Sequence, residues 1–304
     1  MPRRPGNRAW LKSGSDMTEF DEILAGVDWR RMAVPQEDGY DTDVTLRLAE
    51  NGVSPSRPLP YRRRPIDGAA TICDGMVAVR QAPELGLMTD RIVPAQVDHP
   101  NIAAGAAFLA RWPEAWQQFR RLMDTVYPYT DPEQARQGKW ALGSSSHSYE
   151  EDFGSIHATV DNALGFAQAL IHEMVHQKLR ALGVSFEAAD RLIANDPAER
   201  FDSPIRKDQT RPMTAVFHAQ YSFIHVTALD LRMLAAAEGE RERQCILMLL
   251  ARNVPRMQEG HKEVARHIRT DEAGHSFLDA FMEWSGNVLQ QGQAELDASG
   301  FGAR

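Results

Sequence analysis

The segment between Asn162 and Gly183 carries the strongest helical pattern in the chain. Apolar side chains recur along it at spacings of three and four residues, which places them on one face of a helix. Gly183 suits the position just beyond a helix end, where the backbone often turns into the left-handed region. Inside this helix, the sequence HEMVH holds His172 and His176 four residues apart, so both imidazoles project from the same side. The fold must therefore pack one long helix that carries two histidines beside a buried stripe of Leu164, Ala167, Ile171, Val175 and Leu182.

The segments that flank this helix predict the fold class. The sequence GSIHATV at 154–160 alternates apolar and polar residues, as a half-buried strand does. Elsewhere the apolar spacing is typical of helices. We expect a mainly α fold with a small β-sheet (α+β), in which the HEMVH helix packs beside the sheet. The remaining expected elements are a short extended stretch at 140–145, a helix over 101–127 interrupted at Pro113, a helix that starts just after Thr210 with Pro212 in its first turn and runs to about Gly239, and two or three helices over 241–291.

The chain is long enough for one large domain or two small ones, at 304 residues. Residues 1–17 are polar and rich in Arg, Gly and Ser, and we expect them to be disordered. We divide the rest into a mainly helical region over 18–135 and a metal-binding catalytic region over 136–304, which we expect to form one continuous globular unit.

Charge and cysteine content narrow the function classes. The chain has 34 Lys and Arg against 42 Asp and Glu, a formal charge of −8, which argues against a nucleic-acid partner. Cys73 and Cys245 are the only cysteines and form no CxxC pair, so we expect a reducing cytoplasm and no disulfide framework. No apolar run approaches the ~20 residues that a membrane-spanning helix needs, so we expect no membrane association. The sequence does not predict an oligomeric state.

A divalent metal bound by His172 and His176 is the chemistry that HEMVH indicates, with Glu173 placed to act on a metal-bound water or to support the ligands. A catalytic metal usually has a third protein ligand. The metzincin continuation requires Gly and His where this chain has Leu179 and Leu182, so it is absent. We choose His218, on the next helix, as the third ligand; the other candidates are His225, His157, His275, Glu187 and Asp190.

Two longer runs carry a resemblance to a known family. The sequences GSIHATVDNALGFAQALIHEMVHQKL and SPIRKDQTRPMTAVFHAQYSFIHV resemble the HExxH-motif family of peptide-modification proteins, over roughly residues 138–235. The resemblance implies a metal set of His172, His176 and His218. It also singles out Arg206 and Arg211, at the family's SPxR and RP positions, to bind a cosubstrate. The usual iron triad has two His and one carboxylate, and a set of three His departs from it.

The resemblance further implies an Fe(II)- and 2-oxoglutarate-dependent oxygenase that hydroxylates a side-chain β-carbon in a ribosomally made precursor peptide. Tyr221 and His225, which follow His218 on the same helix, are candidates to line its pocket. Two alternatives stay open. One is a zinc metallopeptidase that acts on a peptide, with Glu173 as general base. The other is a non-catalytic protein that presents a peptide to a partner enzyme.

Overall fold

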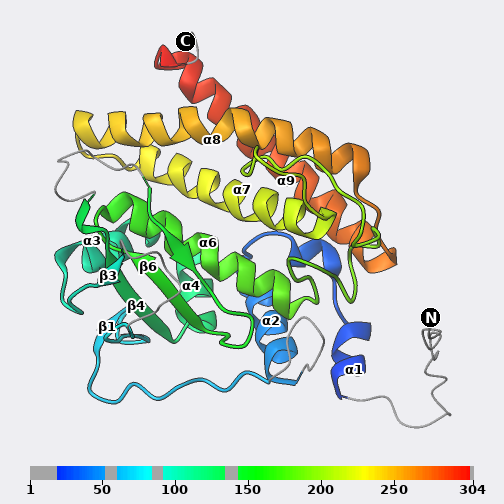
Figure 1. The fold of residues 1–304 in the computed structure, drawn as a ribbon, viewed down its shortest axis with the longest axis horizontal. Helices are drawn as coiled ribbons and strands as arrows, with labels where there is room; N and C mark the ends of the chain where they lie inside the picture. Colours follow the sequence, from blue (N-terminus) through cyan, green and yellow to red (C-terminus); the bar gives the residue numbers. More distant parts are fainter. Residues whose placement is uncertain (1–18, 52–59, 84–91, 134–142, 302–304) are drawn as a thin grey trace, which may run out of the picture.

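The computed structural model describes residues 19–51, 60–83, 92–133 and 143–301. The predicted disordered segment and residues 140–142 of the predicted extended stretch lie outside these ranges. The described chain is mainly helical with one small mixed sheet, as predicted (Figure 1). The helices are α1 (Glu19–Ala25), the 3-10 helix η1 (Trp29–Met32), α2 (Tyr40–Asn51), α3 (Pro100–Leu109), α4 (Pro113–Leu122), α6 (Ala163–Ala181), α7 (Met213–Ala235), α8 (Glu240–His267) and α9 (Glu272–Ala298).

The sheet combines a parallel centre with antiparallel edges. Strands β2, β4 and β6 run parallel, while β1, β3 and β5 each pair antiparallel with a neighbour. The order is β1-β2-β4-β6-β5, with β3 paired to β4, so β5 is an edge strand. The strands are β1 (Ala70–Ile72), β2 (Val77–Val79), β3 (Val93–Pro94), β4 (Thr125–Thr130), β5 (Ser146–His147) and β6 (Ser155–Thr159).

Helix α6, which carries HEMVH, begins and ends where the sequence predicts. The Asn162 side chain caps its first turn by accepting a hydrogen bond from the Gly165 amide at 3.0 Å. Gly183 follows its end with a φ of +91°, a conformation that a residue with a Cβ rarely adopts. In Figure 1, α6 lies between the sheet and the layer formed by α7 and α8. The helix is therefore the centre of the molecule.

Because α6 lies at the centre of the molecule, it is buried on all sides and not only along the predicted apolar stripe. Every residue of the helix except Ala163 and His172 is buried. Its polar side chains are buried because each finds a partner, which removes most of the cost of leaving water. The pairs are Gln168 with Asp230, Glu173 with Ser146 and Ser148, Gln177 with Gly154 and Ser155, Lys178 with Asp41, and Arg180 with Ser148.

Strand β6 and the segment near Tyr127 differ from the predictions. β6 is buried along its whole length because it lies between β4 and β5, with α6 packed against it, so the half-buried prediction was wrong. Tyr127 belongs to β4 and not to a helix, since α4 ends at Leu122. The predicted interruption at Pro113 is confirmed, because α3 ends before it and α4 begins on it.

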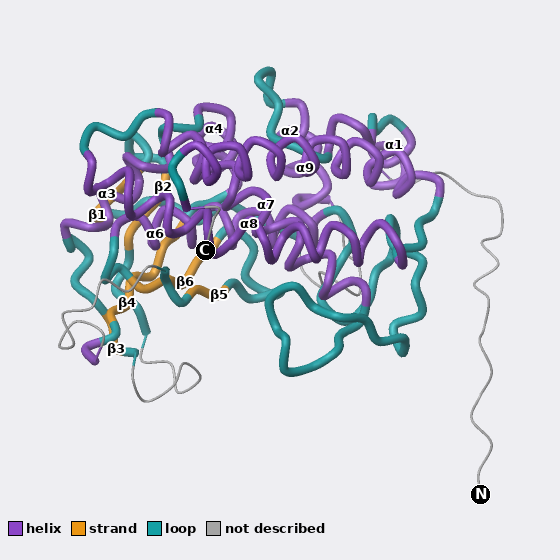
Figure 2. The backbone as a smooth tube through the Cα atoms, turned by 90° about the horizontal axis from the view of Figure 1, so that it is seen from above, coloured by secondary structure: helices purple, strands orange, loops and turns teal. Residues whose placement is uncertain are grey.

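One hydrophobic core runs from Ile23 near the start of the described chain to Leu296 in α9. It joins the regions 18–135 and 136–304, because η1 packs on α9 and α2 packs on α6. Figure 2 shows the strands gathered toward one end of the molecule, with the long helices extending away from them. No helix in the described ranges combines the length and the apolar character that crossing a membrane requires.

Candidate metal centre

His172 and His176 direct their Nε2 atoms at one another across one face of α6. The two nitrogens are 2.9 Å apart. Two nitrogens that bind one metal ion at about 2.1 Å lie about 3.0 Å apart when the angle at the ion is 90°, and about 3.4 Å apart at a tetrahedral angle, so this separation is closer to that of neighbouring ligands in an octahedral site. Burial lowers the pKa of the His172 imidazole and lowers that of His176 well below its usual value. Both rings are therefore neutral at pH 7, the form that binds a metal.

His218 lies behind His176, on the side away from His172. Its Nδ1 is 3.0 Å from Nδ1 of His176, and its Nε2 is 2.9 Å from the carbonyl oxygen of Val184. A carbonyl only accepts, so Nε2 of His218 donates, and the Nδ1 atom of its neutral ring accepts. The Nδ1 atom of His176 must then donate, which leaves the lone pair of His176 on the Nε2 that faces His172. The chain of contacts from Val184 thus selects the tautomer of His176 that a metal needs.

The three predicted ligands form a chain of contacts rather than a set around one point. Among the residues that the structure describes, no group of three His, Cys, Asp or Glu side chains is placed to hold a metal ion. His172 and His176 fit such an ion as a pair. For His218 to be a ligand as well, its ring would have to leave Val184 and His176, so its role as the third ligand stays a prediction.

Glu173 lies on the sheet side of the histidine pair and is 3% exposed. Each of its carboxylate oxygens accepts a hydroxyl hydrogen bond, Oε1 from Ser146 at 2.7 Å and Oε2 from Ser148 at 2.6 Å. Arg180 donates to Ser148 at 3.1 Å, which extends the network about two turns along α6. Oε1 of Glu173 is 4.0 Å from Nε2 of His172. The carboxylate is close to His172 but is held by the serines of β5 and of the segment that follows it.

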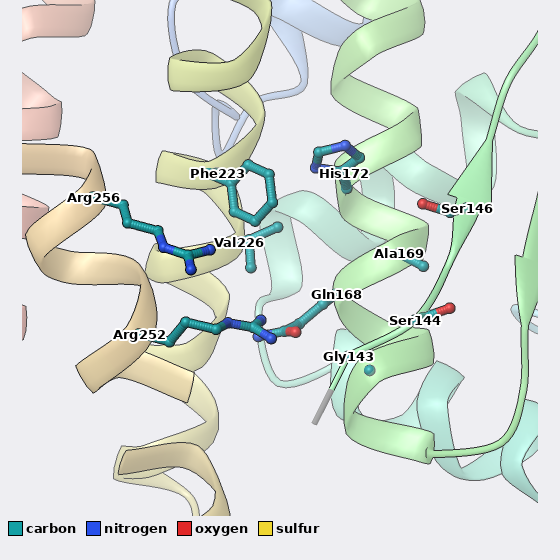
Figure 3. A pocket seen from close by; sticks show the side chains of 11 residues that line it. Gly143, Ser144, Ser146, Gln168, Ala169, His172, Phe223, Val226, Arg252 and Arg256 are labelled. Carbon is teal, nitrogen blue, oxygen red and sulfur yellow. The ribbon is translucent and has the colours of Figure 1, made fainter. Parts of the chain in front are cut away.

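A cavity of about 190 Å³ reaches α6 at His172 (Figure 3). His172 is the residue of HEMVH that is partly exposed, with 20% of its side chain accessible. Phe223 of α7 packs edge-on against its ring at a centroid distance of 4.9 Å. The described lining comprises Gly143, Ser144, Ser146, Gly165, Gln168, Ala169, His172, Phe223, Val226, Arg252 and Arg256.

The arginines that the resemblance singled out lie away from this cavity. Arg206 is exposed and forms a two-bonded ion pair with Asp208, at 3.0 and 2.9 Å. Arg211 pairs through its backbone with Phe201, just before α7 begins. Along α7, this segment precedes His218, whereas the cavity borders Phe223 and Val226 farther along the helix. The cavity lining includes neither arginine.

The two predicted pocket residues of α7 pack in the core. Tyr221 donates from its hydroxyl to the carbonyl of Ala33 at 3.0 Å and contacts Phe277 and Phe281. His225 contacts the ring of Trp284, and burial lowers its pKa to about 3. Neither residue lines the cavity.

Sequence reasoning missed the polar residues that other elements bring to the site. Arg252 and Arg256 come from α8, and Ser146 and Ser148 lie in and beside β5. The one available signal was the four-residue spacing of the two arginines, which puts them on the same face of a helix. This spacing is common on solvated helix surfaces and does not indicate a site by itself.

Comparison with known proteins finds no family model that matches the chain and no match among curated proteins. The resemblance to the HExxH-motif family therefore rests on the quoted sequence runs alone.

Proposed function

We propose that the protein is an Fe(II)- and 2-oxoglutarate-dependent oxygenase that hydroxylates a side-chain β-carbon in a ribosomally made precursor peptide. The observation that carries the proposal is the cavity beside the neutral histidine pair, which has two arginines and no carboxylate in its described lining. Such a site suits a small anionic cosubstrate next to a metal. The peptide, its modified residue and the cytoplasmic location also stay predictions.

His172 and His176 would hold the iron through their Nε2 atoms. Bound iron with 2-oxoglutarate and dioxygen supplies the oxidant for hydroxylation of a C–H bond. The chain's own residues orient and enclose this centre: His218 fixes the ring of His176, and Phe223 packs against the ring of His172. Positions around the ion that the chain does not fill are open to the oxygen atoms of a bound cosubstrate.

The peptide would approach beside β5. This edge strand has one side without a strand neighbour among the described residues, and its Ser146 lines the cavity. An extended peptide can pair with such an edge through main-chain hydrogen bonds. The cavity itself is smaller than the ~300–1,000 Å³ typical of larger ligands, so it suits the cosubstrate and not a peptide segment.

The contacts of Glu173 favour an oxygenase over the zinc peptidase. A peptidase needs this carboxylate to take a proton from the attacking water. Here both oxygens already accept hydroxyl hydrogen bonds at the wall that β5 forms. The carboxylate is thus suited to orienting β5 and the residues around His172, which does not require it to gain a proton.

The test is an anaerobic reconstitution with iron, followed by exposure to air with 2-oxoglutarate and a precursor peptide encoded beside this gene. We expect equal amounts of succinate and of peptide heavier by one oxygen. Cleavage of the peptide with zinc and without succinate would establish the peptidase instead. Peptide that binds but stays unchanged with every metal would favour the presenting role.

Glu173→Gln separates the two enzymes further. A peptidase that loses its general base should lose nearly all turnover, by about 10²–10⁴-fold. In the proposed oxygenase, the amide keeps one acceptor for the serine hydroxyls, and we expect a reduction of no more than about tenfold. Succinate formation measured with saturating peptide distinguishes these results.

A further inference from the structure

The sheet face that turns away from α6 carries a group of aromatic side chains. Along β6, Ile156 belongs to the hydrophobic core, so the next residue, His157, faces the opposite side of the sheet. The neighbours of His157 across the sheet are Tyr127 of β4 and His147 of β5. Tyr149, just after β5, meets the rings of His147 and His157 edge-on, at centroid distances of 4.4 and 5.2 Å. Tyr127, His147, Tyr149 and His157 form the aromatic face.

The aromatic face is open at its rim and closed at its floor. His147 is exposed, and Tyr127 and Tyr149 are half-buried, whereas His157 is 4% exposed. Tyr127 stacks on the His157 ring at a centroid distance of 4.7 Å and an interplanar angle of 23°. A side chain that reaches His157 therefore lies against tyrosine rings.

His157 offers a hydrogen-bond acceptor at this floor. Its Nδ1 lies 3.2 Å from the Tyr129 hydroxyl, which in turn donates to the carbonyl oxygen of Pro83 at 3.1 Å. Because a carbonyl only accepts, the single hydroxyl hydrogen goes to Pro83, and Nδ1 of His157 must donate to Tyr129. Burial lowers the pKa of His157 to about 4, so the ring is neutral at pH 7 and its Nε2 carries a lone pair. This Nε2 has no hydrogen-bond partner among the described residues, so a donor that reaches it removes the cost of an unsatisfied acceptor.

The charges beside the aromatic face favour a cationic donor. Glu150 and Glu151 follow its last tyrosine and form no ion pair with any residue that the structure describes. Arg64, whose charge acts on the buried imidazole, pairs with two aspartates. Arg80, which follows β2, donates to the carbonyl of Pro65, so two carboxylates stand against one arginine without a carboxylate partner.

The chemistry of these groups selects an ammonium or a guanidinium. Such a group donates to the neutral imidazole, packs against the tyrosine rings and is attracted by the glutamates. An anion would meet both the carboxylates and the lone pair. An apolar chain would leave the acceptor without a partner.

Strand β5 connects the aromatic face with the histidine pair. Ser146 directs its hydroxyl to Glu173 on the α6 side, while His147 belongs to the opposite face. A peptide that pairs with β5 presents alternate side chains to these two faces. The residue before or after the one that enters the cavity therefore lies on the side of the aromatic face.

We infer that the aromatic face binds a lysine or arginine side chain of the precursor peptide, one residue before or after the residue that is modified. This inference rests on the proposed function for the identity of the peptide. The cation donates to Nε2 of His157 and packs on Tyr127 and Tyr149, so the aromatic face selects substrates by the neighbour of the modified residue.

Nuclear magnetic resonance of the full chain with isotope-labelled histidine tests the binding without turnover. The probes are acetyl-lysine methylamide and acetyl-norleucine methylamide, which has the same carbon chain without the ammonium group. A chelator is present, so that no divalent ion occupies the histidines of the aromatic face. We expect the lysine probe to shift the Nε2 resonance of His157 and to bind about fivefold more tightly than the norleucine probe.

Variants of the two tyrosines locate the binding. Tyr127→Leu and Tyr149→Leu should each weaken binding of the lysine probe by about fivefold, the loss expected for one cation–aromatic contact. Tyr149→Phe keeps the ring and should keep most of the affinity. Tyr40→Leu is the matched control, because Tyr40 is also half-buried but lies at the start of α2.

Three results overturn the inference. The first is equal affinity for the two probes, and the second is unchanged lysine binding in both Tyr127→Leu and Tyr149→Leu. The third is a His157 resonance that responds only to Zn²⁺ after the chelator is removed, which would make the aromatic face a metal site.

The precursor peptide tests the position of the cation. Norleucine in place of the lysine or arginine beside the modified residue should weaken calorimetric binding of the peptide by about fivefold. The same replacement farther along the peptide should change binding by less than about twofold. A modified residue that has no lysine or arginine neighbour contradicts the inference.

Succinate formation separates a failure of this inference from a failure of the proposed function. A chain that binds the lysine probe at the aromatic face but forms no succinate keeps the binding site and loses the proposed function. A chain that forms succinate and shows no preference for lysine over norleucine keeps the proposed function and loses the inference.

Discussion

The two ring nitrogens of His176 face different neighbours, and these neighbours have different roles. Nε2 faces His172, whereas Nδ1 faces His218, which is held by the carbonyl of Val184. A residue in the position of His218 orients a ligand, and the loss of such a residue typically weakens metal binding by about 10–100-fold. The loss of a ligand itself removes most of the binding.

His218→Gln tests this distinction. We expect Fe(II) affinity to fall by about 10–100-fold, while His172→Ala or His176→Ala removes binding altogether. His275→Gln is the control, because His275 is exposed and lies on α9. Affinities come from anaerobic titration against a competing chelator. A loss in His218→Gln as complete as that in His172→Ala would instead make His218 the third ligand.

Asp230 predicts a pH dependence of stability. Burial raises its pKa from the usual 3.8 to about 7, so between these values the folded protein binds a proton that the unfolded chain has released. Its contribution is fully present below about pH 4 and is lost as pH rises through 7, with a slope of at most about 1.4 kcal/mol per pH unit. Asp230→Asn has no carboxyl that titrates at this position, so its free energy of unfolding lacks this pH dependence.

Urea unfolding of both proteins between pH 5 and 8 measures this contribution. The free energy of unfolding of the unmodified protein, relative to Asp230→Asn, should fall toward pH 7 and then level off. A difference that stays constant over this range would show that Asp230 is ionised throughout. Arg252 lies close to this carboxyl and stays charged over the whole range, so it adds no titration of its own.

At the residue scale, the sequence predicts what lies within one helix. The pair of His172 and His176 follows from a spacing of four along α6, and the structure brings their nitrogens together. The partners of Glu173 and the arginines of the cavity come from β5 and α8. Their positions depend on how three elements pack, which no local spacing encodes.

At the element scale, α6 is attached to α2 by a buried ion pair. Nζ of Lys178 donates to Asp41 at 2.6 Å, and both side chains are fully buried. Gln118 of α4 also donates to Asp41. Removal of one partner leaves a buried charge unpaired, which costs more than the pair contributes.

Lys178→Met should lower the free energy of unfolding by about 3–5 kcal/mol, because Asp41 then stays buried without its cation. Adding Asp41→Asn should recover part of this loss, since the remaining charge is removed. Lys207→Met, at the exposed pair with Glu259, is the control and should change stability by less than about 0.5 kcal/mol. Urea denaturation measures all three. Equal losses in Lys178→Met and Lys207→Met would contradict the role of the buried pair.

The boundaries of elements were predictable where a single residue decides them. Pro113 begins α4 because proline fits the first helical position, and Gly183 ends α6 because it adopts a positive φ. The burial of β6 was not predictable from its alternating sequence. The His157 side chain of this strand stacks on Tyr127, its cross-strand neighbour on β4, and contacts Tyr149 from the segment after β5.

At the scale of the whole molecule, the cavity forms where three layers meet. The sheet contributes Ser146, the central helix α6 contributes His172, and the outer helices contribute Phe223 and Arg252. Helices α6, α7 and α8 contribute residues to one continuous core, and β5 pairs with β6, which also contributes to it. The site is therefore held by rigid packing on several sides, which suits a reaction that requires a fixed distance between a metal and a bound acid.

Anaerobic equilibrium binding of Fe(II) tests the central claim most directly. We predict about one ion per chain, with binding lost in both His172→Ala and His176→Ala and kept in His275→Gln. Circular dichroism of each variant provides the control for folding. An unmodified chain that takes up no divalent metal, or folded His172→Ala and His176→Ala variants that bind as much iron as the unmodified chain, would contradict the claim that HEMVH forms a metal centre.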